Sequence, residues 1–472
     1  MPSLTILCVL LGCLLTLEGS EASSPPAQPP AQPTTPSAER EIAGAFQKGE
    51  YDRAIRLLET LPPNREPSRE TLLLVLQSYL RLGRPEGALT LYSRVVTGNQ
   101  PERPKLLRDI ALGFLTSRVR DPEEHIRIAA YTALAEIGSP DLGALLEDGL
   151  LDSSVLVRAR AIEGIGRAGL AATSLGLRRA LEDTVVAVRI AAINALGEGK
   201  VSAVKPQLIR IARSEEGPEH VFALAALYRL GKADALADIV SASSLPETDV
   251  RMAAIGVLGR LKRPETLDRV GQSVYDPNPS VRAFAAGALG EYGNAEASAP
   301  LTHALEDEDP RVRSIAAASL GKVGSNYSRP LLQQVARDPV ERVRVGAVEG
   351  LLRLGDSEAI LIATDLTKHQ DPSVRGAMAQ ALGLPGLTKA VPLLEPLLVD
   401  QQPQPRLMAV RALGKIGGQQ VVPGLKRALR DSDAAVRIGA AGSLMQVLAR
   451  KKGKPPAGRG AEAGKGALCS VS

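Results

Sequence analysis

Hydrophobic and polar positions along this chain repeat with a period of 31 residues. One register of this repeat has eleven positions, and Arg occupies every one of them except His220. The marker arginines are Arg127, Arg158, Arg189, Arg251, Arg282, Arg313, Arg344, Arg375, Arg406 and Arg437. Ala follows three residues after each marker position except at Met378, and Leu follows seven residues after it except at Ile165. Positions with these offsets share one face of an α-helix, so each marker predicts a helix with one packed face.

A second helix is predicted before each marker, as in the apolar spacing of Leu301, Ala304 and Leu305. Gly stands eleven residues after the marker in eight units, where it suits the left-handed residue that ends a helix. No segment shows the sustained alternation of a strand. The sequence therefore predicts an all-α solenoid over residues 105–449, built from eleven helical hairpins of 31 residues that bury their apolar faces by stacking.

Asp precedes the marker by six residues in eight units, in the predicted turn between the two helices. There it can cap the second helix or accept hydrogen bonds from the Arg of its own or a neighbouring unit. We expect the two columns to form a structural ladder between units, and the alternative is an anion-binding row of arginines. The predicted ladder residues are Asp152, Arg158, Asp183, Arg189, Asp276, Arg282, Asp307, Arg313, Asp338 and Arg344.

The pattern Asp-x-x-x-x-Val-Arg-x-x-Ala-x-x-x-Leu-Gly-x-x-Gly is complete from Asp276 to Gly293 and again from Asp307 to Gly324. It resembles the short HEAT repeat of the phycobilisome-lyase type. The resemblance implies a right-handed α-solenoid, or superhelix, with the second helices on the concave side. The unit of His220 lacks both Asp and Arg, and Leu245 replaces Asp in the next unit, so we expect a weaker ladder there.

Residues 39–104 have a different repeat, in which Gly49 and Ala54 recur 34 residues later as Gly83 and Ala88. This spacing of turn Gly and packed Ala resembles the tetratricopeptide repeat. We therefore expect a small tetratricopeptide-like helical region before the array.

The two ends of the chain carry different signals. The apolar run 4–17 is too short to cross a bilayer and suits a secretory signal peptide over residues 1–22. An alternative is a lipoprotein signal, in which a lipidated Cys13 attaches the protein to a membrane. Residues 23–38 are expected to form a Pro-rich linker and residues 450–472 a basic disordered tail. We therefore expect an exported protein, which is periplasmic, envelope-associated or secreted.

Composition excludes several functions. The tail holds six basic residues and one acidic residue, the whole of the net charge of +5, so the body is close to neutral. Aromatic residues are 3% of the chain, too few for base-stacking platforms, and no nucleic-acid partner is expected. The Gly164–Gly169 segment matches a dinucleotide fingerprint by letters, but it closes a predicted helix instead of following a strand.

Candidate chemistry is sparse as well. Some relatives of the resembled family act on bilin pigments, and another hydroxylates lysine at a di-iron site that uses His-Glu pairs. This chain has no His-Glu pair, and its four histidines are spread over separate units. We expect no catalytic residues, no metal site and no cofactor.

Large apolar residues two positions after the marker are the candidate partner-binding residues: Phe222, Phe284, Ile315 and Met408. The competing interpretation of these four is packing between units. The sequence favours a non-catalytic scaffold that binds a protein partner, with its oligomeric state open. One alternative is a regulatory or chaperone-like subunit of an envelope complex, and another is an enzyme related to bilin lyases.

Overall fold

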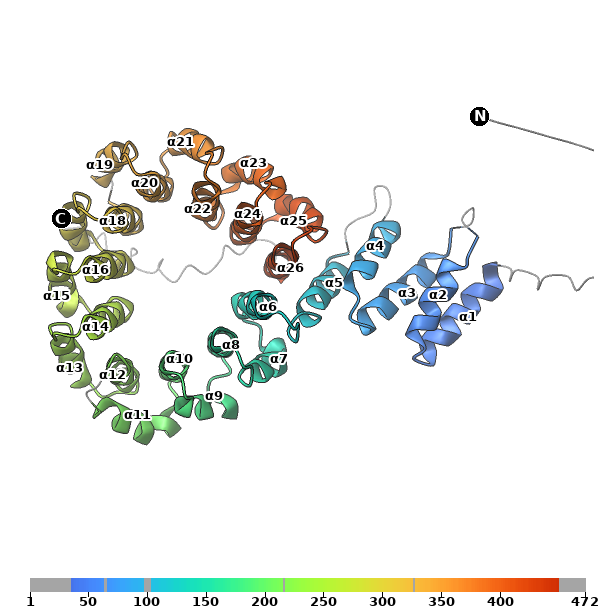
Figure 1. Ribbon diagram of the computed structural model, residues 1–472, viewed down its shortest axis with the longest axis horizontal. Coiled ribbons are helices and arrows are strands. Elements are labelled where there is room, and N and C mark those ends of the chain that lie inside the picture. Colours follow the sequence, from blue (N-terminus) through green and yellow to red (C-terminus); the bar gives the residue numbers. More distant parts are fainter. Residues whose placement is uncertain (1–34, 63–65, 97–102, 215–216, 326, 450–472) are drawn as a thin grey trace, which may run out of the picture.

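The computed structural model describes residues 35–62, 66–96, 103–214, 217–325 and 327–449, and within these ranges it contains helices and no strand. The predicted signal peptide, most of the linker and the tail lie outside the described residues. From residue 104 to 449 the chain forms eleven hairpins of one outer and one inner helix (Figure 1). The predicted all-α solenoid of stacked hairpins is confirmed.

Apart from the first, the outer helices are short, and several continue into a 3-10 turn, as α9 does into η2 (Ala180–Glu182). They are α5 (Pro104–Thr116), α7 (Gly143–Gly149), α9 (Leu175–Arg179), α11 (Lys205–Ala212), α13 (Ala235–Ala242), α15 (Leu267–Gln272), α17 (Ser298–Ala304), α19 (Ser328–Val335), α21 (Ala359–Leu366), α23 (Val391–Leu394) and α25 (Val422–Ala428).

The inner helices carry the marker positions. They are α6 (Glu124–Ile137), α8 (Val155–Arg167), α10 (Val186–Glu198), α12 (Glu219–Arg229), α14 (Thr248–Leu261), α16 (Pro279–Tyr292), α18 (Pro310–Val323), α20 (Glu341–Arg353), α22 (Pro372–Leu382), α24 (Pro403–Ile416) and α26 (Ala434–Ala449). They line the concave side, as the resemblance implied (Figure 1).

The repeat columns form the core. The residue three after each marker position is fully buried in all eleven units, and the Leu or Ile seven after it is almost fully buried. At most steps the inner helices approach closely because small residues face each other there. A Cβ added to Gly321 would lie 2.3 Å from the Cα of Gly350 in the next unit. Packing of this kind joins the units into one continuous core.

Helix ends follow the glycine column. Gly138, Gly293 and Gly324 all have a positive φ, as do the other five glycines eleven residues after a marker position. The described residues contain two non-glycine residues with positive φ, Lys200 at 51° and Lys262 at 54°. Both stand in this same column, so the repeat imposes a left-handed residue even where Gly is missing.

Two further hairpins precede the array: α1 (Thr35–Gln47) with α2 (Tyr51–Glu59), and α3 (Arg69–Arg81) with α4 (Pro85–Val95). Gly49 and Gly83 have positive φ in the turns, and Ala54 and Ala88 are fully buried. These hairpins extend outward from α5 (Figure 1). Their assignment to the tetratricopeptide family stays a prediction.

The array closes on itself. The last inner helix, α26, packs against α5 and α6 of the first unit, so the eleven units form a ring (Figure 1). A Cβ added to Gly442 would lie 2.9 Å from the Cβ of Ala133. Arg430, just after α25, donates to the Ser93 hydroxyl of α4 at 2.9 Å, and the Lys426 ammonium lies 5.3 Å from the centre of the Tyr92 ring. We call the seam the set of contacts that α26, Arg430 and Lys426 make with α4, α5 and α6.

Candidate functional site

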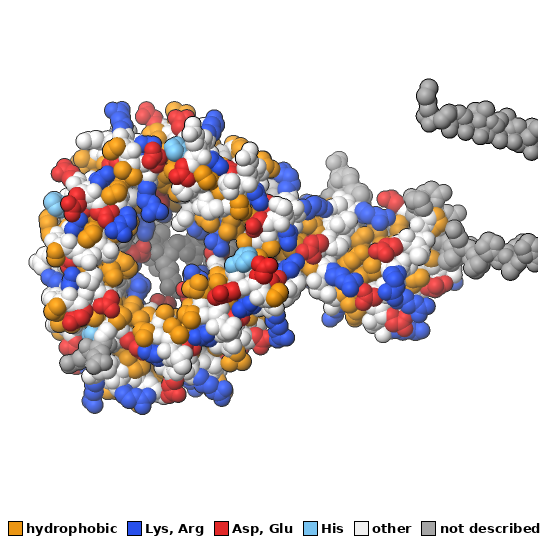
Figure 2. Space-filling model, in the orientation of Figure 1, with side chains coloured by type: hydrophobic (Ala, Val, Ile, Leu, Met, Phe, Trp, Pro, Cys, Tyr) orange, Lys and Arg blue, Asp and Glu red, His pale blue; other side chains and the backbone are white. Residues whose placement is uncertain are grey.

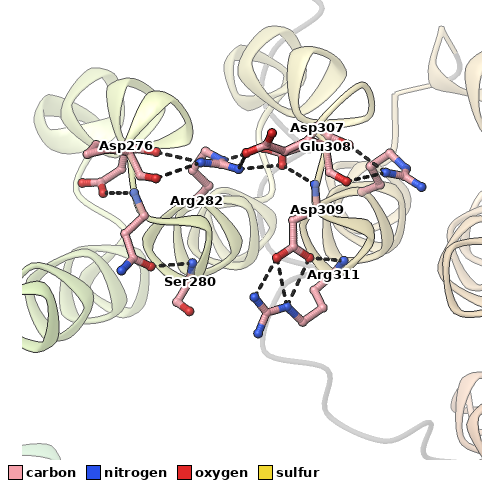
Figure 3. Close-up of polar contacts among 10 residues, drawn as sticks. Asp276, Ser280, Arg282, Asp307, Glu308, Asp309 and Arg311 are labelled. Atoms are coloured by element: carbon pink, nitrogen blue, oxygen red, sulfur yellow. Dashed lines mark hydrogen bonds and ion pairs between the residues drawn. The ribbon is translucent and has the colours of Figure 1, made fainter.

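One edge of the ring is held by an Arg–Asp ladder. Arg282 donates from Nε and Nη2 to the two carboxylate oxygens of Asp307 in the next unit, at 2.7 and 2.9 Å. Its Nη1 donates to the backbone carbonyl of Asp276 in its own unit at 3.0 Å (Figure 3). Each such Arg therefore ties the turn of its own unit to the turn of the next.

The same bidentate contact recurs at other steps. It joins Arg127 to Asp152, Arg158 to Asp183, Arg251 to Asp276, Arg313 to Asp338, Arg375 to Asp400 and Arg406 to Asp431. The Asp also accepts the amide of the residue two positions later, as Asp152 does from Ser154 at 2.8 Å. The carboxylate oxygens of these Asp residues thus accept their hydrogen bonds from groups of the protein itself.

Burial and hydrogen bonding act oppositely on these carboxylates. Burial alone would raise the pKa of Asp152, but the hydrogen bonds from Arg127 and from the Ser154 amide outweigh it and lower the pKa below the ordinary value. The pKa values of Asp183 and Asp338 are lowered by the same balance. At Asp400 the hydrogen bond from Arg375 is the largest influence, and it lowers the pKa.

The ladder changes where the sequence departs from the pattern. Arg189 meets Glu219 of α12, at 2.7 and 2.8 Å, in place of the missing Asp. His220 has no guanidinium, and its Nδ1 lies 2.6 Å from the carbonyl of Gly217. No ion pair among the described residues joins His220 to the next unit, because Leu245 occupies the position at which that unit would supply the Asp of the ladder. A hollow of about 760 Å³ lies beside His220 and Leu245.

Arg344 also differs from the expected ladder, because His369 stands where the next unit would supply Asp. Its Nη1 still donates to the carbonyl of Asp338 at 2.9 Å, but its Nη2 donates to Glu341 of its own helix at 3.2 Å. A His at position 369 was visible in the sequence and could have marked this gap.

The concave wall holds a groove of about 910 Å³ across the inner helices α14 to α22. Phe284 and Ile315 lie in it with 51% and 37% of their surface exposed. Small residues form its floor: a Cβ added to Gly256 would lie 3.7 Å from the Phe284 ring, and one added to Gly287 would lie 3.7 Å from Ile315. Figure 2 shows the central opening of the ring bordered by hydrophobic and basic side chains.

The four candidate partner-binding residues therefore divide into two pairs. Phe284 and Ile315 share the groove and keep large exposed faces. Phe222 and Met408 are only partly exposed and pack against the core. The guanidinium of Arg260 lies 5.6 Å from the centre of the Phe222 ring and covers it further. At this position of the repeat, Phe284 and Ile315 therefore belong to a surface, and Phe222 and Met408 belong to the packing between units.

Arg229 and Arg260 on the same wall have no ion-pair partner among the described residues. Burial lowers the pKa of each, and repulsion from Arg229 lowers that of Arg260 further, while Glu198 opposes the shift. Nη1 of Arg229 is buried without a hydrogen-bond partner in the described part of the chain.

The described ranges contain neither a cluster of metal-ligating side chains nor a helix suited to span a membrane. Within them, no group of three or more His, Cys, Asp and Glu side chains is placed to hold a metal ion. No described helix combines the length and the apolar character that a transmembrane span needs.

Comparison with known families assigns the repeats. A family model for HEAT repeats matches residues 270–351, 328–406 and 393–457. This part of the array consists of HEAT repeats, and the units before it continue the same 31-residue register. No curated protein matches the chain.

Three solved structures illustrate the likeness in architecture. The CpcE–CpcF complex of phycocyanin lyase from Nostoc sp. is 20% identical, with 52% of this chain and 94% of that chain covered and a TM-score of 0.37. Kap121p bound to Nup53p is 14% identical over 86% of this chain and 53% of that chain, about half its length, with a TM-score of 0.34. Human deoxyhypusine hydroxylase is 16% identical over 67% and 97%, with a TM-score of 0.27. Likeness at this level carries no functional argument.

Proposed function

We propose that this protein is a non-catalytic interaction scaffold that binds a protein partner on the concave wall of its ring. The observation that supports this most is the pair Phe284 and Ile315, which are exposed side by side in a groove although neighbouring columns are buried. Exposed apolar side chains in a concave surface are typical anchors for a partner. The repeat supplies the long surface, and binding needs no reactive group.

We also propose that the protein is exported, since residues 1–22 have the pattern of a secretory signal. The mass of the mature protein tests this. Loss of the apolar run 4–17 supports a cleaved signal, and a lipid-bearing terminus at Cys13 supports the lipoprotein form. A mature mass that includes the run without lipid contradicts export.

Affinity capture from a membrane fraction tests the scaffold role, with a double variant, Phe284→Ser with Ile315→Ser, as the comparison. We expect the variant to lose the captured partner while its melting temperature stays close to that of the wild type. The matched control is Leu361→Ser, which removes a 69% exposed side chain from the outer helix α21 and should keep the partner. A large fall in melting temperature of the double variant would instead assign both residues to packing.

The enzyme alternative predicts a different outcome. A lyase that acts on bilins should carry a pigment, or turn over an added one, when it is purified. A visible absorption band that co-purifies with the protein would contradict the scaffold proposal.

A further inference from the structure

The groove around Phe284 and Ile315 has a charge pattern that restricts its partner. Four cations line it, Arg260, Arg311, Lys322 and Arg342, against two carboxylates, Glu291 and Glu349. The two carboxylates are already paired, Glu291 with Lys322 at 3.0 Å and Glu349 with Arg353 at 2.8 Å. The groove therefore offers no free carboxylate among its described residues.

Two of the cations have no carboxylate partner in the described part of the chain, although one of them, Arg260, lies over the Phe222 ring. Arg311 is paired with Asp309, but no ion pair among the described residues engages Arg260 or Arg342. Arg260 lies near Arg229, whose buried Nη1 also lacks a partner. An unpaired guanidinium gains charge-assisted hydrogen bonds from an incoming carboxylate, and the gain is larger where burial limits the competition from water, as it does at Arg260.

The apolar strip has a defined spacing. Phe284 and Ile315 hold equivalent positions on the adjacent helices α16 and α18, and packed helices stand about 8–10 Å apart. Residues i and i+7 of an α-helix are separated by about 10.5 Å along its axis. One helix laid across the inner helices could thus seat two apolar side chains, one beside each anchor.

We propose that the groove binds an acidic amphipathic segment of a partner protein, with apolar side chains on Phe284 and Ile315 and carboxylates on Arg260 and Arg342. This inference rests on the proposed scaffold function and specifies the partner's chemistry. The chain's own tail, residues 450–472, is a poor match because it is basic. A nucleic acid would supply anions but would leave the apolar strip unmatched and would meet two carboxylates.

Fluorescence anisotropy with synthetic probes and the full chain tests the proposal. The main probe is a helix-forming Ala-based peptide with Leu at i and i+7 flanked by Glu. Its three controls replace Glu by Lys, replace Leu by Gln, or use the sequence of residues 450–472. A single-stranded oligonucleotide is the fourth control. We expect binding of the Glu–Leu peptide alone, weakening as salt is raised.

Variants locate the contact. Phe284→Ser with Ile315→Ser should weaken the Glu–Leu peptide by roughly tenfold or more, and Arg260→Gln with Arg342→Gln by a similar factor. Neither Arg260 nor Arg342 belongs to the hydrophobic core, so the second pair keeps the test valid if the first pair fails to fold. Leu361→Ser should leave the affinity unchanged.

Several results would overturn the proposal: equal or tighter binding of the Lys–Leu peptide, the tail peptide or the oligonucleotide, or unchanged affinity in both double variants. If wild-type protein still captures a partner from the membrane fraction in those cases, the scaffold function stands and only the assigned chemistry fails.

Discussion

The marker Arg acts as a joint between units, because its planar group has enough donors for two turns at once. In the step from Arg375 to Asp400 the two charge-assisted bonds are 2.6 and 2.8 Å long. The Asp400 side chain is only 8% exposed, so water cannot replace the Arg if the contact is lost. The buried, fully bonded geometry favours a structural role over an anion-binding one at this step.

Asp400→Asn tests this role. We expect a loss of about 2–3 kcal/mol in the free energy of unfolding, because the Arg375 charge stays partly buried without its counter-ion. Urea unfolding followed by circular dichroism measures it. Glu265→Gln is the control, since the pair of Glu265 with Arg263 is exposed, and it should leave the midpoint unchanged. Equal behaviour of the two variants would assign the ladder no special role.

Acid should weaken the ladder. The pKa values of Asp152, Asp183, Asp338 and Asp400 are lowered in the folded protein, so the unfolded chain binds protons first as the pH falls. Their stabilisation is complete above the unfolded pKa of about 4 and is lost as the pH falls through the lower folded values. We expect a melting temperature that holds down to about pH 5 and declines below about pH 4. Asp400→Asn should make this decline shallower, and an unchanged slope would contradict the linkage.

At the scale of the helix, the repeat fixes where most inner helices end, the exceptions being α22, which ends at Leu382 before Gly386, and α26, which runs through Leu448. Lys200 and Lys262 occupy the left-handed position although their side chains disfavour it, at about 1–2 kcal/mol per residue. The position was visible in the sequence as the Gly column. The positive φ of the two lysines is a finding of the structure, and it shows that the repeat overrides the local preference of Lys at this position.

Lys200→Gly should therefore stabilise the protein by about 1 kcal/mol, because Gly adopts positive φ without strain. Lys262→Gly should gain less, since it also loses the contact of Lys262 with Glu291, which lie 3.9 Å apart. Thermal unfolding measures both. Arg210→Gly within α11 is the opposite control and should cost about 1 kcal/mol, because Gly weakens a helix interior. A loss of stability at Lys200 would show that its side chain contributes contacts that outweigh the strain.

The sequence predicted the element order and the core because every unit repeats nearly the same pattern of Ala, Leu and Gly positions. It predicted the groove less well. Phe222 and Phe284 hold the same position in their units. Arg260 of the next inner helix covers the Phe222 ring, whereas the Phe284 ring stays exposed, so the difference between them comes from neighbouring units. The repulsion between Arg229 and Arg260 was not visible in the sequence either, because the two residues are one repeat apart in the chain and only the stacking of the units brings them close.

At the scale of the whole molecule, closure is the feature that the repeat pattern could not predict. The curvature of a solenoid is the sum of small rotations at each step, and no single residue encodes that sum. The seam also uses a different register from the other steps. Between interior units, Gly383 faces Ala412, and this Gly stands eight residues after the marker of its unit. At the seam the Gly that faces Ala133 is Gly442, which stands only five residues after the marker of its unit. The column of Gly442 holds residues as large as Glu163, Glu349 and Arg411 in other units, and Gly287 shares it without lying at the seam, so a Gly in this column does not by itself mark closure.

The equivalent of Gly442 in an interior unit is Gly287, which lies in the groove and has only Ile315 within reach of a new Cβ. Phe at position 287 can extend into the central opening. At position 442 the new Cβ alone would lie 2.9 Å from Ala133, so a Phe there cannot fit while α26 stays against α6. The two glycines therefore form a matched pair that separates closure from the fold of a unit.

Gly442→Phe should open the ring. We expect small-angle scattering to show a larger radius of gyration and maximum dimension, because α26 leaves the first unit while the remaining steps keep their ladder and core. Helix content by circular dichroism should stay unchanged, and Gly287→Phe should keep the dimensions of the wild type. Arg430→Ala, which removes the hydrogen bond to Ser93, should shift the dimensions in the same direction by less. If Gly442→Phe keeps the closed dimensions with native helix content, the seam tolerates a large side chain and closure does not depend on this contact. If the dimensions grow and the helix content is also lost, the seam stabilises the whole array instead of merely joining its ends.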